Sequence, residues 1–161
     1  MKTVMALAVC GLIVGGCASS GGGNAKLAGR ATDAQRSALF DRVKTLQGTW
    51  VAKDDKGQEH TVALFALSSS GSVVREIMLP GSEQEMTNVY HMDGPTLVMT
   101  HYCAMGNQPR LRAVAGDPNV IDLKFDSVTN LQGSEYMGGL KITFKDGKAQ
   151  PHAMFALTRK K

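Results

Sequence analysis

Residues 121–126, Ile-Asp-Leu-Lys-Phe-Asp, alternate apolar and charged side chains, and residues 140–145, Leu-Lys-Ile-Thr-Phe-Lys, repeat the alternation. A period of two is typical of a β-strand with one buried and one solvated face. The apolar side chains of both stretches are therefore expected to point into a core: Ile121, Leu123, Phe125, Leu140, Ile142 and Phe144.

The same alternation recurs along most of the chain after Trp50, and turn-forming sequences such as Pro80-Gly81 and Asp93-Gly94-Pro95 interrupt it about every ten residues. Because no helical pattern separates these segments, neighbouring strands should pair as antiparallel hairpins. Such hairpins build a closed up-and-down barrel or a sandwich. The expected strands are residues 49–53, 61–68, 72–79, 85–92, 96–103, 110–115, 120–125, 139–145 and 152–158.

A helical pattern precedes the strands. Thr32 and Gln35 have the spacing of a capping box, which marks the start of a helix. Apolar side chains then recur at helical spacing. One helix is expected over residues 33–46, with an apolar stripe made of Leu39, Phe40, Val43 and Leu46.

The junction between that helix and the first strand reads Leu46-Gln47-Gly48-Thr49-Trp50, and Arg159 follows the last strand. This combination resembles the calycin superfamily of lipocalin-like barrels, in which a Gly-x-Trp opens the first strand. The resemblance implies structural roles for Gly48, Trp50 and Arg159, with the guanidinium over the indole closing one end of the barrel. The expected fold is mainly β: an antiparallel up-and-down lipocalin-like β-barrel of about nine strands, preceded by one N-terminal α-helix, over residues 32–161.

The N-terminus has the features of an export signal. Lys2 is followed by an apolar run over residues 4–14, which is too short for a permanent membrane span and predicts a cleaved signal peptide over residues 1–16. The sequence Val14-Gly15-Gly16-Cys17 resembles a bacterial lipobox. The resemblance implies a diacylglyceryl thioether and an N-acyl chain on Cys17, and several acyl chains anchor a protein stably to a membrane. The alternative is an ordinary secretory signal with an incidental cysteine.

Residues 17–31 are rich in Gly, Ser, Ala and Asn and show no apolar period, which predicts a flexible tether behind the lipidated cysteine. Ala18 follows the cysteine in place of Asp, which favours the outer membrane of a Gram-negative host. We therefore expect a lipid-anchored protein of the bacterial cell envelope that faces the periplasm.

Length and charge exclude several classes of protein. Removal of residues 1–16 would leave 145 residues, enough for one core but not for a second catalytic domain. The formal net charge of +4 is too small and too scattered to indicate nucleic-acid binding. Cys10 would leave with the signal and Cys17 would carry lipid, so Cys103 would remain without a disulfide partner.

The strand over residues 96–103 carries the most promising chemistry. If its inward face lines a cavity, that face passes from apolar side chains to a histidine and a cysteine, as in barrels that bind small molecules. Alternation places Leu97, Met99, His101 and Cys103 on the inward face, and Val98, Thr100 and Tyr102 on the outward face.

Several roles are open to His101 and Cys103. His101 is a core histidine bonded to a neighbouring strand, a ligand contact, or a metal or haem ligand. A His-x-Cys pair places two donors on one strand face, but a tetrahedral metal site needs two more ligands. Cys103 is an inert buried thiol or a reactive group.

The hairpin sequence Asn107-Gln108-Pro109-Arg110 carries two neutral amides. It predicts either a capped turn with Asn107 in a left-handed conformation, or a polar lid that contacts the head group of a ligand. Glu76 interrupts an otherwise apolar strand. If it points inward, its carboxylate needs a partner such as Tyr90, Arg110 or Arg112, because an unpaired buried charge is costly.

Nothing in the sequence resembles a catalytic triad, paired glycosidase carboxylates, a phosphate-binding loop or a zinc signature. The expected function is non-catalytic binding of a small apolar or amphipathic molecule, without a cofactor. The alternatives are a haem- or metal-binding barrel that uses His101, and a barrel filled by side chains with a structural role in the envelope. The candidate ligand-binding residues are Glu76, Tyr90, Met99, His101, Cys103, Asn107, Gln108 and Arg110.

Overall fold

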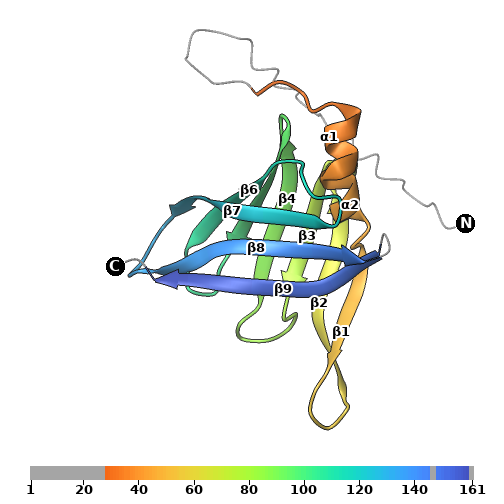
Figure 1. The fold of residues 1–161 in the computed structure, drawn as a ribbon. Helices are drawn as coiled ribbons and strands as arrows, with labels where there is room; N and C mark the ends of the chain where they lie inside the picture. Colours follow the sequence, from red (N-terminus) through yellow and green to blue (C-terminus); the bar gives the residue numbers. More distant parts are fainter. Residues whose placement is uncertain (1–27, 146–147, 160–161) are drawn as a thin grey trace, which may run out of the picture.

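The computed structural model describes residues 28–145 and 148–159, with side chains up to Phe144. The predicted signal peptide, Cys17 and the tether up to residue 27 lie outside these residues, as does the side chain of Arg159. The described part is mainly β and forms one antiparallel sheet, in which the strands lie side by side in their order along the chain (Figure 1). The predicted up-and-down arrangement is thus confirmed. Within these residues no helix is long and apolar enough to cross a membrane.

Each strand expected from the alternation overlaps a strand of the structure. In the order of the sheet, β1 and β9 are the two edges, and no pairing between them is found within the described residues. The sheet is strongly curved, so that β8 and β9 pass across the front of β3 and β4 in Figure 1. The strands are β1 (Gly48–Lys53), β2 (Glu59–Ser68), β3 (Val73–Met78), β4 (Met86–Asp93), β5 (Thr96–Tyr102), β6 (Gln108–Ala113), β7 (Val120–Thr129), β8 (Glu135–Lys145) and β9 (Lys148–Arg159).

The prediction of a single N-terminal helix over residues 33–46 is wrong. The capping box at Thr32 does start a helix, but α1 spans only Asp33–Ala38 and α2 spans Phe40–Lys44. Between them Leu39 leaves the helical region, at φ −122° and ψ −79°. This break lets Leu39 and Phe40 both enter the core, at 1% and 3% exposure, and burial of two large side chains outweighs the lost helical hydrogen bonding.

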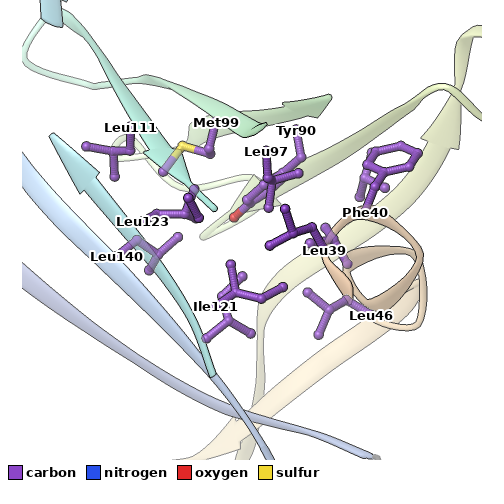
Figure 2. Close-up of a cluster of buried hydrophobic side chains, with 14 of the residues drawn as sticks. Leu39, Phe40, Leu46, Tyr90, Leu97, Met99, Leu111, Ile121, Leu123 and Leu140 are labelled. Carbon is purple, nitrogen blue, oxygen red and sulfur yellow. The ribbon is translucent and has the colours of Figure 1, made fainter. Parts of the chain in front are cut away.

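The hydrophobic core lies between the helical segment, residues 33–46, and the inner face of the sheet (Figure 2). The segment sits at one end of the curved sheet in Figure 1, so its apolar side chains fill that end. As predicted, Ile121, Leu123, Leu140, Ile142 and Phe144 are buried. The labelled core residues are Leu39, Phe40 and Leu46 from the helical segment, and Tyr90, Leu97, Met99, Leu111, Ile121, Leu123 and Leu140 from the strands.

The prediction that Phe125 is buried is wrong, because its side chain is 39% exposed. The register pairs Phe125 with the buried Leu111, so the two side chains share a face of the sheet. The preceding residue Arg110 pairs with Ser127, so β7 carries one extra residue and its regular alternation ends directly after Phe125. Phe125 packs instead against Tyr136, with the ring centroids 4.6 Å apart.

Alternation places Val98 on the outward face of β5, yet its side chain is only 1% exposed. It stands directly between His91 of β4 and Arg112 of β6 in the pairing register. Arg112 is held near the surface by ion pairs to Asp93 at 2.8 Å and Asp126 at 3.2 Å. Long side chains fixed in this way cover apolar neighbours through their methylene stems, which explains the burial of Val98.

The end of the predicted tether contacts the β4–β5 turn. Gly94 in this turn has φ +57°, and a Cβ atom there would lie 2.8 Å from the carbonyl oxygen of Gly29 and 3.3 Å from the Cβ of Ala28. Residues 28 and 29 are therefore packed beside the turn and are not a free linker.

Replacing Gly94 by alanine is expected to lower the free energy of unfolding by about 1–2 kcal/mol, because the positive φ strains an L-residue and the new methyl group clashes with Gly29. Gly81→Ala is the matched control, since Gly81 has φ +76° but no atom within 4 Å of the added Cβ. Chemical denaturation should show the larger loss for Gly94→Ala. Equal losses would mean that residues 28 and 29 do not pack against the turn.

Candidate ligand-binding site

A cavity of about 940 Å³ adjoins the hydrophobic core. Five residues, Leu46, Tyr90, Met137, Leu140 and Ile142, belong to both the core and the cavity wall. The described wall comes from the α2–β1 junction, from β1, β2, β3, β4, β5 and β8, and from the turns after β3 and β5, so strands from distant positions in the sheet order face one space. Most of the remaining wall is apolar: Trp50, Val62, Ala63, Phe65, Met78, Leu79, Met86, Ala104 and Met105.

A polar cluster of four side chains interrupts the apolar wall. We call Glu76, Asn88, Tyr90 and His101 the polar cluster; all four line the cavity and are at most 8% exposed. Glu76 of β3 pairs with Asn88 of β4, which pairs with His101 of β5. These three residues therefore stand side by side on one face of the sheet, and Tyr90 follows Asn88 on the same face.

Hydrogen bonds join the four side chains of the polar cluster to one another. The Tyr90 hydroxyl donates to Glu76 Oε2 at 2.6 Å, and Asn88 Nδ2 donates to the same oxygen at 2.7 Å. Asn88 Nδ2 also contacts Met78 Sδ at 3.3 Å. His101 Nδ1 lies 2.7 Å from Asn88 Oδ1. Glu76 thus has the partners that a buried carboxylate requires. Of the three partners expected from the sequence, Tyr90 bonds to Glu76, and neither Arg110 nor Arg112 does.

These contacts fix the tautomer of His101. A carboxylate only accepts hydrogen bonds, so the amide nitrogen of Asn88 must face Glu76 and its oxygen must face His101. The imidazole therefore donates through Nδ1–H, and in its neutral form Nε2 carries the lone pair. Burial lowers the pKa of His101 to about 4, so the neutral form prevails at physiological pH.

Burial also governs the two acids of the cluster. It raises the pKa of Glu76, although the hydrogen bonds from Tyr90 and Asn88 act in the opposite direction by favouring the carboxylate. Burial likewise raises the pKa of the Tyr90 hydroxyl well above its ordinary value, and the nearby charge of Glu76 raises it further. Tyr90 is therefore a fixed hydrogen-bond donor to Glu76.

The structure brings four of the eight predicted ligand-binding residues to the cavity: Glu76, Tyr90, His101 and Cys103. Cys103 is half-buried, and its Sγ lies 3.5 Å from the backbone nitrogen of Met105. Met99 is fully buried in the core and does not line the cavity. The inward face of β5 is thus divided between core and cavity.

Residues 107–110 do not supply a lid to this cavity, although Ala104 and Met105 of the turn before them line its wall. The side chain of Asn107 is buried and donates to the backbone oxygen of Glu135 at 2.9 Å, while Gln108 donates to the backbone oxygen of Gly106 at 2.9 Å. Arg110 is exposed. The expected left-handed conformation at Asn107 is wrong, because Gly106 adopts the positive φ, at +80°; glycine does so without a Cβ penalty.

Trp50 lines the cavity and donates its indole N–H to the backbone oxygen of Leu46 at 2.7 Å. Gly48, two residues before Trp50, has φ +134°. The predicted contact between Trp50 and Arg159 involves a side chain outside the described residues. Within the described part, a cation–π contact at the helical end joins the Arg42 guanidinium to the Phe144 ring, 3.9 Å from the centroid.

Asn88, the residue that links Glu76 to His101, is not among the residues predicted from the sequence. A usable signal exists, because asparagine is depleted in strand interiors and Asn88 shares a strand face with Tyr90. The register that places it between Glu76 and His101 depends on three strands pairing in order, which local patterns do not specify. Within the described residues, no three His, Cys, Asp or Glu side chains gather as a potential metal site.

The comparisons with known proteins give no direct guide to this site. No protein-family model matches the sequence, and a search of curated proteins finds no match. The cavity and its polar cluster are therefore the features that point to a function.

Proposed function

We propose that this protein binds a small apolar or amphipathic molecule in the cavity, without catalysing a reaction on it. The observation that carries the proposal is a largely apolar space of about 940 Å³ with one compact polar cluster in its wall. Apolar walls with a few fixed polar groups are the usual construction of small-molecule sites. The apolar wall would hold the tail of an amphiphile, and His101 Nε2 would accept a hydrogen bond from its head group.

We further propose that the curved sheet encloses this cavity as a lipocalin-like barrel. Trp50 of β1 and Phe65 of β2 line the same space as Tyr136 and Leu140 of β8. Strands near opposite ends of the sheet order therefore face each other across the cavity, which favours a rolled sheet over a flat one. The core at the helical end would close one end and leave the rest hollow.

The test is titration of the full chain, reconstituted in lipid nanodiscs, with n-octanol. Trp50 is the only tryptophan of the sequence and lines the cavity, so its fluorescence reports occupancy. His101→Ala should weaken binding about five- to thirtyfold, since a hydrogen bond is worth on the order of 1–2 kcal/mol. Thr100→Ala, on the opposite face of β5, should leave the affinity within about twofold.

The same experiment separates the alternatives. A signal that does not saturate with n-octanol would contradict the binding function and favour a structural envelope protein. Equal affinities in the His101 and Thr100 variants would place the head group elsewhere. An absorption spectrum of the purified protein with a haem band that disappears in His101→Ala would replace the amphiphile proposal by the haem-binding alternative.

We propose that the chain is anchored through lipid on Cys17 to the outer membrane of a bacterial envelope, facing the periplasm. The lipobox-like sequence ending at Cys17 supports this proposal. Cys17→Ser should abolish both cleavage before residue 17 and acylation, because both steps require the thiol. Metabolic labelling with palmitate checks the outcome, with Cys10→Ser as the control that keeps its label. Normal labelling of Cys17→Ser would refute the anchor.

A further inference from the structure

We propose that the cavity selects amphiphiles whose head group donates hydrogen bonds, a protonated amine above all, and discriminates against carboxylates. This inference rests on the proposed binding function and names the ligand class. It follows from a complete count of the hydrogen atoms that the polar cluster offers.

Every polar hydrogen in the cluster is already used within the protein. The hydroxyl of Tyr90 and the amide of Asn88 donate to Glu76 Oε2, with Met78 Sδ as a second contact of the amide. The Nδ1–H of His101 donates to Asn88 Oδ1. Neutral His101 has no other N–H.

The groups left over are acceptors. No bond from a described residue reaches Glu76 Oε1 or His101 Nε2, and both residues line the cavity. The cluster therefore presents two acceptors and a carboxylate charge to a ligand. A carboxylate head group would bring more acceptors and a second negative charge, whereas an ammonium group supplies three donors and the opposite charge.

The other charged residues of the described wall lie in exposed positions. Glu83 and Lys141 line the cavity but are exposed to solvent, unlike Glu76 at 8% exposure. Opposite charges attract more strongly where water is excluded. Glu76 should therefore dominate the selection, and Lys141 would attract a carboxylate only at the solvent-exposed part of the wall.

The experiment compares n-octylamine, n-octanol and octanoate, which share one chain length, on the full chain in nanodiscs at pH 8. Trp50 fluorescence is the readout, and the partition of each probe is corrected with empty nanodiscs. Octylamine should bind at least about tenfold more tightly than octanoate, as expected for a charge-assisted hydrogen bond against like-charge repulsion.

Glu76→Gln removes the charge and replaces the free oxygen by an amide donor, while the remaining oxygen can still accept from Tyr90 and Asn88. It should bring the octylamine-to-octanoate ratio to about one or below. Glu83→Gln makes the same chemical change in an exposed part of the wall and should preserve the ratio within about twofold. Circular dichroism checks that both variants fold.

The outcomes separate this inference from the function on which it rests. Octanol binding together with octanoate binding as tight as octylamine in the wild-type chain would overturn the selectivity and keep the binding function. Tight octanoate binding that disappears in Lys141→Gln would place the head group at the exposed wall, with the same consequence. The absence of saturable binding by all three probes would overturn both.

Discussion

Leu123→Ala is expected to lower the free energy of unfolding by about 2–5 kcal/mol, the range for truncating a fully buried leucine. Leu123 is 0% exposed and lies in the core cluster beside Leu111 and Leu140 (Figure 2). The surrounding side chains come from different strands and from the helical segment, so they cannot close the gap without moving the sheet. Chemical denaturation of the full chain, followed through Trp50 fluorescence, gives the difference.

Phe125→Ala is the matched control on the same strand. This substitution removes a larger side chain, but Phe125 is 39% exposed and its main contact is with Tyr136. The free energy of unfolding should therefore fall by only about 1 kcal/mol. The two residues share a face of β7, and their exposure distinguishes them. A loss for Phe125→Ala equal to that for Leu123→Ala would show that Phe125 is buried as completely as Leu123.

Local chemistry explains why the strands could be predicted. Alternation at residues 121–126 and 140–145 reflects one buried face, and glycine or proline ends most strands at turns that only those residues form easily. The up-and-down order then follows because short turns can join only neighbouring antiparallel strands.

The errors occur where tertiary packing overrides a local pattern. The stripe over residues 39–46 fits one helix, but burying Leu39 and Phe40 together requires a break between α1 and α2. The alternation also includes Phe125, but the regular pairing ends at a bulge directly after it, and its side chain stays 39% exposed. Neither the break nor the bulge has a glycine or proline that could have indicated it.

The candidate site was predicted in part, for the same reason. Alternation predicts an inward face of β5 for His101 and Cys103, and both line the cavity. The cost of burying a charge requires a partner for an inward Glu76, and of the partners left open by the sequence Tyr90 is the one that bonds to it. The polar composition of residues 107–110 does not distinguish side chains that contact a ligand from side chains that bond to the backbone of the protein, as Asn107 and Gln108 do. Asn88 required the register of β3, β4 and β5, which only the assembled sheet defines.

Because His101 is neutral in the folded protein, we expect the free energy of unfolding to fall in weak acid. Burial lowers its pKa from 6.5 to about 4 in the folded protein, so between these values the unfolded chain binds a proton that the folded chain does not. Stability should therefore fall as the pH decreases from 6.5 towards 4. The depression corresponds to roughly 3–4 kcal/mol at most, at about 1.4 kcal/mol for each pKa unit.

Glu76 acts in the opposite direction. Its pKa is raised by burial, so on acidification the folded state gains that proton before the unfolded state does, which partly offsets the effect of His101. The wild-type curve alone therefore mixes two contributions. A variant that removes only the imidazole is needed to separate them.

His101→Gln provides that variant, because its amide can still donate to Asn88 Oδ1 but does not titrate. The free energy of unfolding, measured at intervals from pH 7.5 to pH 4, should fall more steeply for the wild type than for His101→Gln. The same comparison in a Glu76→Gln background removes the opposing contribution, so the difference between the curves should grow there. A wild-type curve parallel to that of His101→Gln in both backgrounds would mean that the folded chain binds this proton as readily as the unfolded chain, and that burial does not lower the pKa of His101.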